Sequence, residues 1–260
     1  MPRQLLLAHD SSPEADLALL RAGQLARQLD ARLSLAHVLE DGDEASSRRR
    51  LEALAADCGL AISDVHLRRG PAVESLAALA SGLEADLLLL GRHRAGAVEG
   101  FAGTTLERLL LASPVPLLLV VNPTGLPYSR ALAALDFSAC ASRAWQRAAE
   151  LLPATGELRA LHVHESAGLD LPDEAELALD RELFDRLLED LNAHQAGSAR
   201  GSHEVRSGER LQCLEEAIAG FDPQVLALGV HSRGEMSSAL VGSLTRQLLE
   251  NPPCDLLLSR

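Results

Sequence analysis

Two aspartates and two glycine-containing stretches carry the residues of this 260-residue chain whose spacing suits ligand chemistry. Asp10 and Asp136 each follow a short apolar run, at the carboxyl end of a predicted strand. Gly91 and Gly229 close a later apolar run, and the Gly-Thr or Gly-Ser beyond it opens a predicted helix. A glycine before a helix lets the backbone approach a ligand, and the free amides of the first turn favour an anion. Because a neighbouring aspartate can accept hydrogen bonds from ribose hydroxyls, the pattern predicts a site for a phosphorylated nucleoside.

The chain carries this pattern twice, which indicates an internal repeat. Each half opens with an apolar strand, an aspartate, a serine and a helix, followed by a strand that ends in His37-Val38 or His162-Val163. The second copy is longer, mainly between residues 172 and 195. The Pro- and Gly-containing segment 122–129 reads as a linker, so we predict one domain over 1–123 and another over 129–260.

Short apolar runs alternate with helical patterns in both halves. Strands are predicted at 4–9, 33–38, 63–68, 86–90 and 116–121, then at 130–135, 157–163, 202–206, 224–228 and 255–259. Helices are predicted at 13–29, 43–57, 71–81 and 103–112, then at 139–152, 173–195, 208–219 and 243–250. This alternation predicts an α/β fold of two doubly wound, five-stranded parallel sheets in tandem. Ligands of such sheets bind beyond the carboxyl ends of the strands, where the aspartates and glycines lie.

Composition excludes several classes of function. The chain has 24 basic and 37 acidic residues, a net charge of −13, which disfavours binding to nucleic acid. It contains no lysine, so a Walker A loop, Schiff-base catalysis and attachment of pyridoxal phosphate are all excluded. Its four cysteines are far apart in sequence, which argues against a paired-cysteine zinc site and a disulfide framework.

No segment is expected to span a membrane. The longest apolar stretch, 109–121, is interrupted by a serine and two prolines. The first residues turn polar after three leucines, too early for a signal peptide, so the expected location is the cytoplasm.

The glycine pattern of the second half resembles the universal stress protein (UspA) family. ATP-binding members of that family carry G-x2-G-x9-G-[S/T] after the fourth strand and an aspartate at the end of the first. Here Gly229 is followed by Ser232 in place of the second glycine, then by nine residues and Gly242-Ser243. The resemblance covers nearly the whole chain and implies a tandem pair of Rossmann-like domains, similar to adenine nucleotide α-hydrolases.

The first half departs further from the family pattern. Gly91 is followed by Arg94 where the second glycine is expected, and the loop to Gly103-Thr104 is one residue short. Arg94 would either pair with a phosphate or block the pocket. We therefore expect nucleotide mainly in the second half.

The resemblance implies a set of contacts for an adenine nucleotide, with ATP as the expected ligand and an accompanying Mg²⁺ left open. In the second half these residues are Asp136, Val163, Gly229, Val230, Ser232, Gly242, Ser243 and Leu244. The corresponding second site would use Asp10, Val38, Gly91, Arg94, Gly103 and Thr104. The resemblance also implies that the two halves pair with each other through their last strands. Whether two chains form a homodimer stays open, and protein partners are unknown.

The sequence contains no recognisable catalytic constellation. It has no GxSxG or HExxH motif, so we expect no catalytic residue and no enzyme. His162 and His164 form an HxH pair, but two ligands on one strand do not make a metal site, and structural histidines are the favoured interpretation.

Three functions remain open from the sequence. The leading one is a cytoplasmic stress-response regulator that binds ATP. The first alternative is a nucleotide-independent interaction module, which Ser232, Arg94 and the shortened first loop favour. The second alternative is a weak nucleotide hydrolase, which would need a base or metal ligand beyond Asp10 and Asp136.

Overall fold

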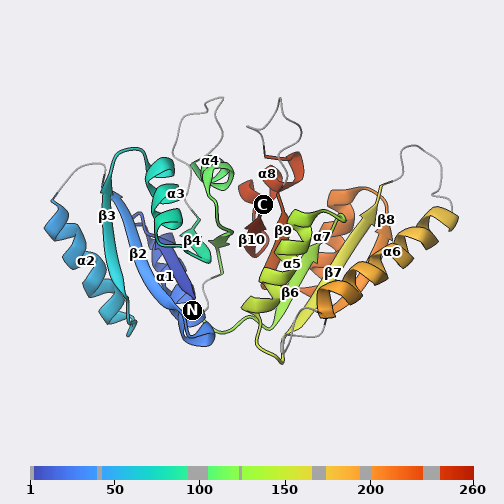
Figure 1. The fold of residues 1–260 in the computed structure, drawn as a ribbon, viewed down its shortest axis with the longest axis horizontal. Helices are drawn as coiled ribbons and strands as arrows, with labels where there is room; N and C mark the ends of the chain where they lie inside the picture. The colour runs from blue at the N-terminus through green and yellow to red at the C-terminus, as the bar shows by residue number, and fades with distance from the viewer. Residues whose placement is uncertain are drawn as a thin grey trace. The chain divides into compact units, whose positions relative to one another are not determined.

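The computed structural model describes residues 3–39, 43–92, 105–122, 125–165, 174–193, 201–230 and 241–260. The chain divides into two compact units, Met1–Pro127 and Tyr128–Arg260 (Figure 1). The division falls inside the segment 122–129 that reads as a linker. Arg94, Gly103, Thr104 and Ser232, four of the candidate site residues, lie outside the described ranges.

The first unit is a five-stranded parallel sheet in the order β3-β2-β1-β4-β5. Its elements are β1 (Gln4–Ala8), α1 (Pro13–Leu29), β2 (Arg32–Leu39), α2 (Glu44–Asp57), β3 (Asp64–Arg69), α3 (Ala72–Gly82), β4 (Leu87–Gly91), α4 (Thr105–Ala112) and β5 (Leu117–Val120). Helices α3 and α4 pack against each other, and right-handed crossovers place α1 and α2 on the opposite face. The order of the strands reverses between β1 and β4, which is where such sheets bind ligands.

The second unit repeats this topology in the order β8-β7-β6-β9-β10. Its elements are β6 (Arg130–Ala134), α5 (Ala139–Leu151), β7 (Glu157–His164), α6 (Glu174–Ala193), β8 (Gly201–Ser207), α7 (Arg210–Phe221), β9 (Val225–Gly229), α8 (Ser243–Glu250) and β10 (Asp255–Ser259). The switch point lies between β6 and β9. The predicted doubly wound α/β architecture is confirmed, with the described helices and strands within about two residues of their predicted bounds.

The central strands are buried on both faces because helices cover both sides of each sheet. Leu5, Leu6 and Leu7 of β1 are at most 1% exposed, and so are Leu256, Leu257 and Leu258 of β10. Continuous leucine runs of this kind are typical of parallel sheets covered on both faces. With few aromatic residues in the chain, leucine fills these cores.

Serine side chains fix where the first helix of each unit begins. The Ser12 hydroxyl accepts a hydrogen bond from the Ala15 amide at 3.2 Å, and Pro13 occupies the first helical position. The Ser138 hydroxyl accepts the corresponding bond from the Ala141 amide at 3.1 Å. The segment between strand and helix is therefore only a few residues long in both units.

No helix among the described residues is long and apolar enough to cross a lipid bilayer.

Tyr128 and Asp255 form a buried polar contact at the start of the second unit. The Tyr128 hydroxyl donates to Asp255 Oδ2 at 2.5 Å, and both residues are 0% exposed. Replacing Tyr128 by Phe removes a donor from a buried carboxylate, so we expect a loss of about 1.5–3 kcal/mol in the free energy of unfolding. Chemical denaturation of the full chain measures this loss.

Ser129→Ala is the matched control, because its hydroxyl bond to Gln224 is exposed. We expect this variant to stay within about 0.5 kcal/mol of the parent chain. Equal stabilities of Tyr128→Phe and Ser129→Ala would contradict the importance of the buried contact.

Candidate functional site

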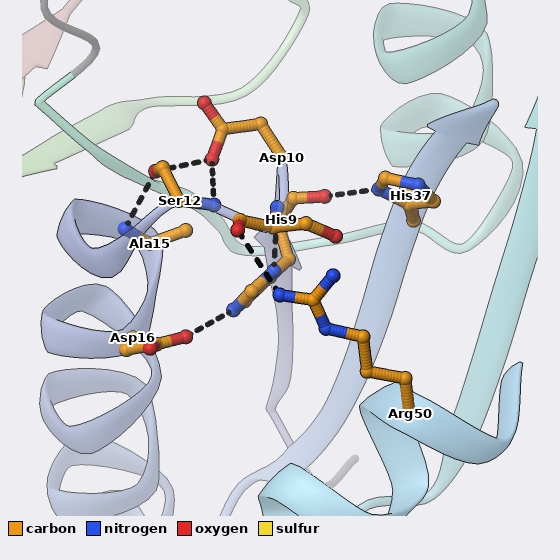
Figure 2. Close-up of polar contacts among 8 residues, drawn as sticks. His9, Asp10, Ser12, Ala15, Asp16, His37 and Arg50 are labelled. Carbon is orange, nitrogen blue, oxygen red and sulfur yellow. Dashed lines mark hydrogen bonds and ion pairs between the residues drawn. The ribbon is translucent and has the colours of Figure 1, made fainter. Parts of the chain in front are cut away.

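Asp10 and Asp136 organise the turn that joins the first strand of each unit to its first helix. Asp10 Oδ1 accepts hydrogen bonds from the Ser12 amide at 3.0 Å and from the Ser12 hydroxyl at 2.5 Å (Figure 2). Asp136 Oδ1 accepts from the Ser138 amide at 3.2 Å. Both aspartates are exposed and lie just beyond the carboxyl end of a central strand. Their strands end two residues earlier than the aspartates, at Ala8 and Ala134.

The residue that follows each aspartate has a left-handed backbone. Ser11 has φ = 66° and Phe137 has φ = 62°. A residue with a side chain avoids this region unless its surroundings hold it there, and such strain is concentrated at functional sites. The two turns therefore share a conformation that their sequences, Asp-Ser-Ser and Asp-Phe-Ser, do not by themselves favour.

A histidine of the second strand fixes the entry to each turn. His37 Nδ1 lies 2.6 Å from the carbonyl oxygen of His9, and His162 Nδ1 lies 2.8 Å from that of Leu135. Because a carbonyl can only accept, Nδ1 carries the proton in both rings. Both histidines thus hold the strand end beside their turn.

Gly91 and Gly229 lie at the carboxyl ends of β4 and β9, and packing accounts for both. A Cβ on Gly91 would lie 2.4 Å from the carbonyl oxygen of Glu14 in α1. A Cβ on Gly229 would lie 2.4 Å from the Ala141 amide nitrogen in α5. The sequence suggested glycine for approach to a ligand, whereas here it lets the first helix pack against the neighbouring strand end. That contact brings the aspartate turn to the switch point.

Gly242, Ser243 and Leu244 form the start of α8. Gly242 is exposed, has φ = −57°, and a Cβ added there would meet nothing within 4 Å among the described residues. As the N-cap residue, Gly242 has no side chain with which to make a capping bond. Unlike Gly229, this glycine meets no described residue that would require it for packing, and the free amides of a first helical turn favour an anion.

The three valines among the predicted nucleotide contacts differ in whether they are free to touch a ligand. Val38 and Val163 are half-buried at the ends of β2 and β7, next to the turns. Val230 is 3% exposed, and its amide donates to the Ser259 carbonyl at 2.7 Å. Its amide therefore serves the sheet, and a direct contact from that group to a ligand is not supported.

Sequence reasoning missed the residues that hold the second turn in place. The Phe137 ring packs edge-on against His162, with centroids 4.6 Å apart, and lies 5.9 Å from Phe184 of α6. Asp180 of α6 lies 2.6 Å from His164 Nδ1 and 3.6 Å from His162 Nε2. The longer segment of the second copy thus supplies a helix that packs beside its turn. The repeat did mark Phe137, which stands where the first half has serine.

The first turn is held by polar groups instead. His9 is 3% exposed, and its Nε2 lies 3.1 Å from Asp16 Oδ1 on α1. Arg50 of α2 lies with Nη2 3.3 Å from the Ser11 carbonyl oxygen (Figure 2). Burial lowers the pKa of His9 from its ordinary value of 6.5, although the Asp16 carboxylate acts in the opposite direction. None of these three residues was among the predicted site residues.

Among the residues that the structure describes, no group of three or more histidine, cysteine, aspartate or glutamate side chains could hold a metal ion.

Comparison with known proteins decides the family. The model of the universal stress protein family matches residues 1–121 and again residues 127–260. The chain belongs to the universal stress protein family. A curated relative, the "universal stress protein in QAH/OAS sulfhydrylase 3′region" of Thermus aquaticus, is 32% identical over 137 residues, which are 46% of this chain and 99% of the relative. Proteins of this family are generally regulatory and not enzymes, in agreement with the prediction from the sequence.

A solved structure that is matched over nearly the whole chain agrees with the fold. A universal stress protein from Archaeoglobus fulgidus DSM 4304 is 17% identical, with a TM-score of 0.71 over 99% of this chain and 98% of its own. A universal stress protein solved in complex with cAMP is 24% identical, with a TM-score of 0.41 over 47% of this chain and 98% of its own. The tandem arrangement of two universal stress protein domains is thus established for this chain.

If Gly229 is required for packing, replacing it should destabilise the protein even without a bound ligand. Gly229→Ala places a methyl group against the α5 backbone, so we expect about 1–3 kcal/mol of destabilisation. Gly220→Ala in α7 is the control, because a Cβ there meets no described residue within 4 Å. That variant is expected to gain about 0.5–1 kcal/mol from the lower entropy of its unfolded state. A neutral Gly229→Ala in ligand-free thermal unfolding would contradict the packing role.

Proposed function

We propose that this universal stress protein is a cytoplasmic regulator that binds an adenine nucleotide, with ATP as the favoured ligand, mainly through its second domain. The observation that carries the proposal is the start of α8. Gly242 begins this helix without a capping side chain, and a Cβ there would meet no described residue within 4 Å. A helix end of this kind, just past the carboxyl end of β9, suits phosphate oxygens.

The Asp136 turn supplies the complementary part of the site. Strands β6 and β9 are neighbours, so the Asp136 turn and the end of β9 share one edge of the sheet. We assign Asp136 to the ribose, Val163 to the adenine, and Ser243 and Leu244 to the phosphates. Ser243 is exposed at the first helical position, where its amide and hydroxyl can both donate. Mg²⁺ would accompany the phosphates as in other nucleotide complexes.

The first domain has the same turn and is proposed as a second, weaker site. Asp10 and Val38 take the positions of Asp136 and Val163 in the fold. The Arg50 guanidinium at the Ser11 carbonyl adds a positive charge beside this turn. Gly91 is not itself evidence for this second site, since packing against α1 already requires a glycine there.

One observation favours the alternative of a nucleotide-independent interaction module. Gly91 and Gly229, which belong to the nucleotide-binding pattern of the family, are both required by helix packing. They would therefore persist in a domain that binds no nucleotide. The two functions differ in whether Gly242, which no described residue requires for packing, matters for ligand binding.

Calorimetric titration of nucleotide-stripped full chain with MgATP tests the proposal. We expect saturable binding, and a thermal stabilisation of about 2.7 kcal/mol at 100 times the Kd. Gly242→Val adds a branched side chain beside the α8 amides, so we expect its ATP affinity to fall at least about tenfold, equivalent to 1.4 kcal/mol.

Gly220→Val is the matched control, because it adds the same side chain in open space on another helix. Its ATP affinity is expected to equal that of the parent chain. Absence of binding at millimolar MgATP, or equal affinities of the two valine variants, would count against nucleotide binding at α8 and favour the interaction module.

A further inference from the structure

The imidazole of His9 sits between the first turn and the first helix. His9 follows β1, where its amide donates to the Ala36 carbonyl at 2.8 Å and continues the ladder of the sheet. Its Nδ1 lies 3.0 Å from the Ser11 amide nitrogen, and its Nε2 lies 3.1 Å from Asp16 Oδ1 (Figure 2). The ring is therefore bonded at both nitrogens, once to the turn and once to α1.

The partners of the ring define its protonation state. The Ser11 amide can only donate, so His9 Nδ1 has no proton in this arrangement. A carboxylate can only accept, so Nε2 carries the proton that faces Asp16. The uncharged ring satisfies both partners. A second proton, on Nδ1, would remove the acceptor of the Ser11 amide and set two N–H groups against each other.

Charged groups on each neighbouring element influence whether His9 takes up a second proton. Asp16 on α1 and Asp10 in the turn favour the charged ring, whereas His37 on β2 opposes it. Arg50 on α2 meets the same turn at the Ser11 carbonyl. Burial has the largest effect and lowers the pKa of His9 below 6.5, so the ring is uncharged at neutral pH.

The second turn has no equivalent group. Within the repeat, Leu135 stands in the position of His9, and Ser142 in that of Asp16. Phe137, the left-handed residue there, is held by ring contacts with His162 and Phe184. His162 bonds its turn as a donor, through Nδ1–H to the Leu135 carbonyl, whereas His9 bonds its turn as an acceptor.

We propose that His9 is a positioning residue of the first domain, which holds the Asp10 turn in its binding conformation only while the ring is uncharged. Protonation releases the left-handed Ser11 and with it the bonds between Asp10 and Ser12. The first domain then loses affinity for adenine nucleotide in acid, and the second domain does not. The nucleotide part of this inference rests on the proposed function, whereas the release of the turn does not.

Nuclear magnetic resonance of the nucleotide-free full chain, from about pH 8 to about pH 5, tests the release of the turn. The Ser11 amide and the two ring nitrogens of His9 should follow one common transition below pH 6.5, with Nε2 as the protonated nitrogen above it. The Phe137 amide is the internal control and should not follow this transition. A Ser11 amide that does not titrate, or one that titrates together with Phe137, would overturn the proposal.

Two variants, which give His9 and Asp16 the residues found at the same positions of the second half, distinguish a pH-dependent role of His9 from a merely structural one. His9→Leu should abolish the Ser11 transition. Asp16→Ser keeps the ring but removes a carboxylate that favours its charged form, so the transition should move to lower pH. Asp16→Ser also decides the matter if His9→Leu does not fold. A transition that moves to higher pH in Asp16→Ser, or one that persists in a folded His9→Leu, would overturn the proposal.

MgATP titrations followed at the two turns test the consequence for binding. Amide shifts of Ser11 and Ser12 report on the first domain, and those of Phe137 and Ser138 on the second. Relative to the second domain, which corrects for titration of the phosphates themselves, first-domain affinity should fall up to about tenfold across the transition, as expected for one lost hydrogen bond. An unchanged ratio would overturn the link between turn and ligand. No ATP binding at either turn, with the Ser11 transition intact, would contradict the proposed function and still support the switch.

Discussion

The bond from a second-strand histidine to the carbonyl that precedes each aspartate turn fixes the geometry on which both units depend. In each unit it sets the end of the first strand, after which one left-handed residue reverses the chain and a serine begins the helix. The helix then packs so closely on the next strand end that only glycine fits at positions 91 and 229. Turn, helix start and glycine are consequently coupled, and together they leave the aspartate exposed at the switch point of the sheet.

The two copies stabilise this shared turn with different chemistry. The first copy uses a buried imidazole, a carboxylate and a guanidinium, from His9, Asp16 and Arg50. The second uses the ring of Phe137 against His162 and a helix of its longer insertion. His9 accepts a hydrogen bond from the Ser11 amide, whereas His162 donates one to the Leu135 carbonyl, so a proton added at Nδ1 can break only the first of these bonds. Under the proposed switch, the first turn responds to acid through this bond and the second turn does not.

The sequence predicted the fold well because its signals are local. Ser12-Pro13 marked the start of α1, and the runs of leucine marked the buried strands. It identified Gly91 but missed its packing role, because the approach of α1 to β4 joins residues far apart in the chain. Asp180 carried no signal, since no spacing indicates that a residue of α6 reaches His164 on β7. The contrast of His9 with Leu135 was visible in the repeat and becomes meaningful only with the bonds of the ring.

Photo-crosslinking with azido-ATP, followed by mass spectrometry of the labelled peptides, tests the central claim most directly. The claim is that an adenine nucleotide lies between the Asp136 turn and the start of α8. It predicts label on peptides that contain residues 157–164 or 130–138, removed by excess ATP and lost in Gly242→Val. Label confined to other parts of the chain, or label that excess ATP does not remove, would contradict it.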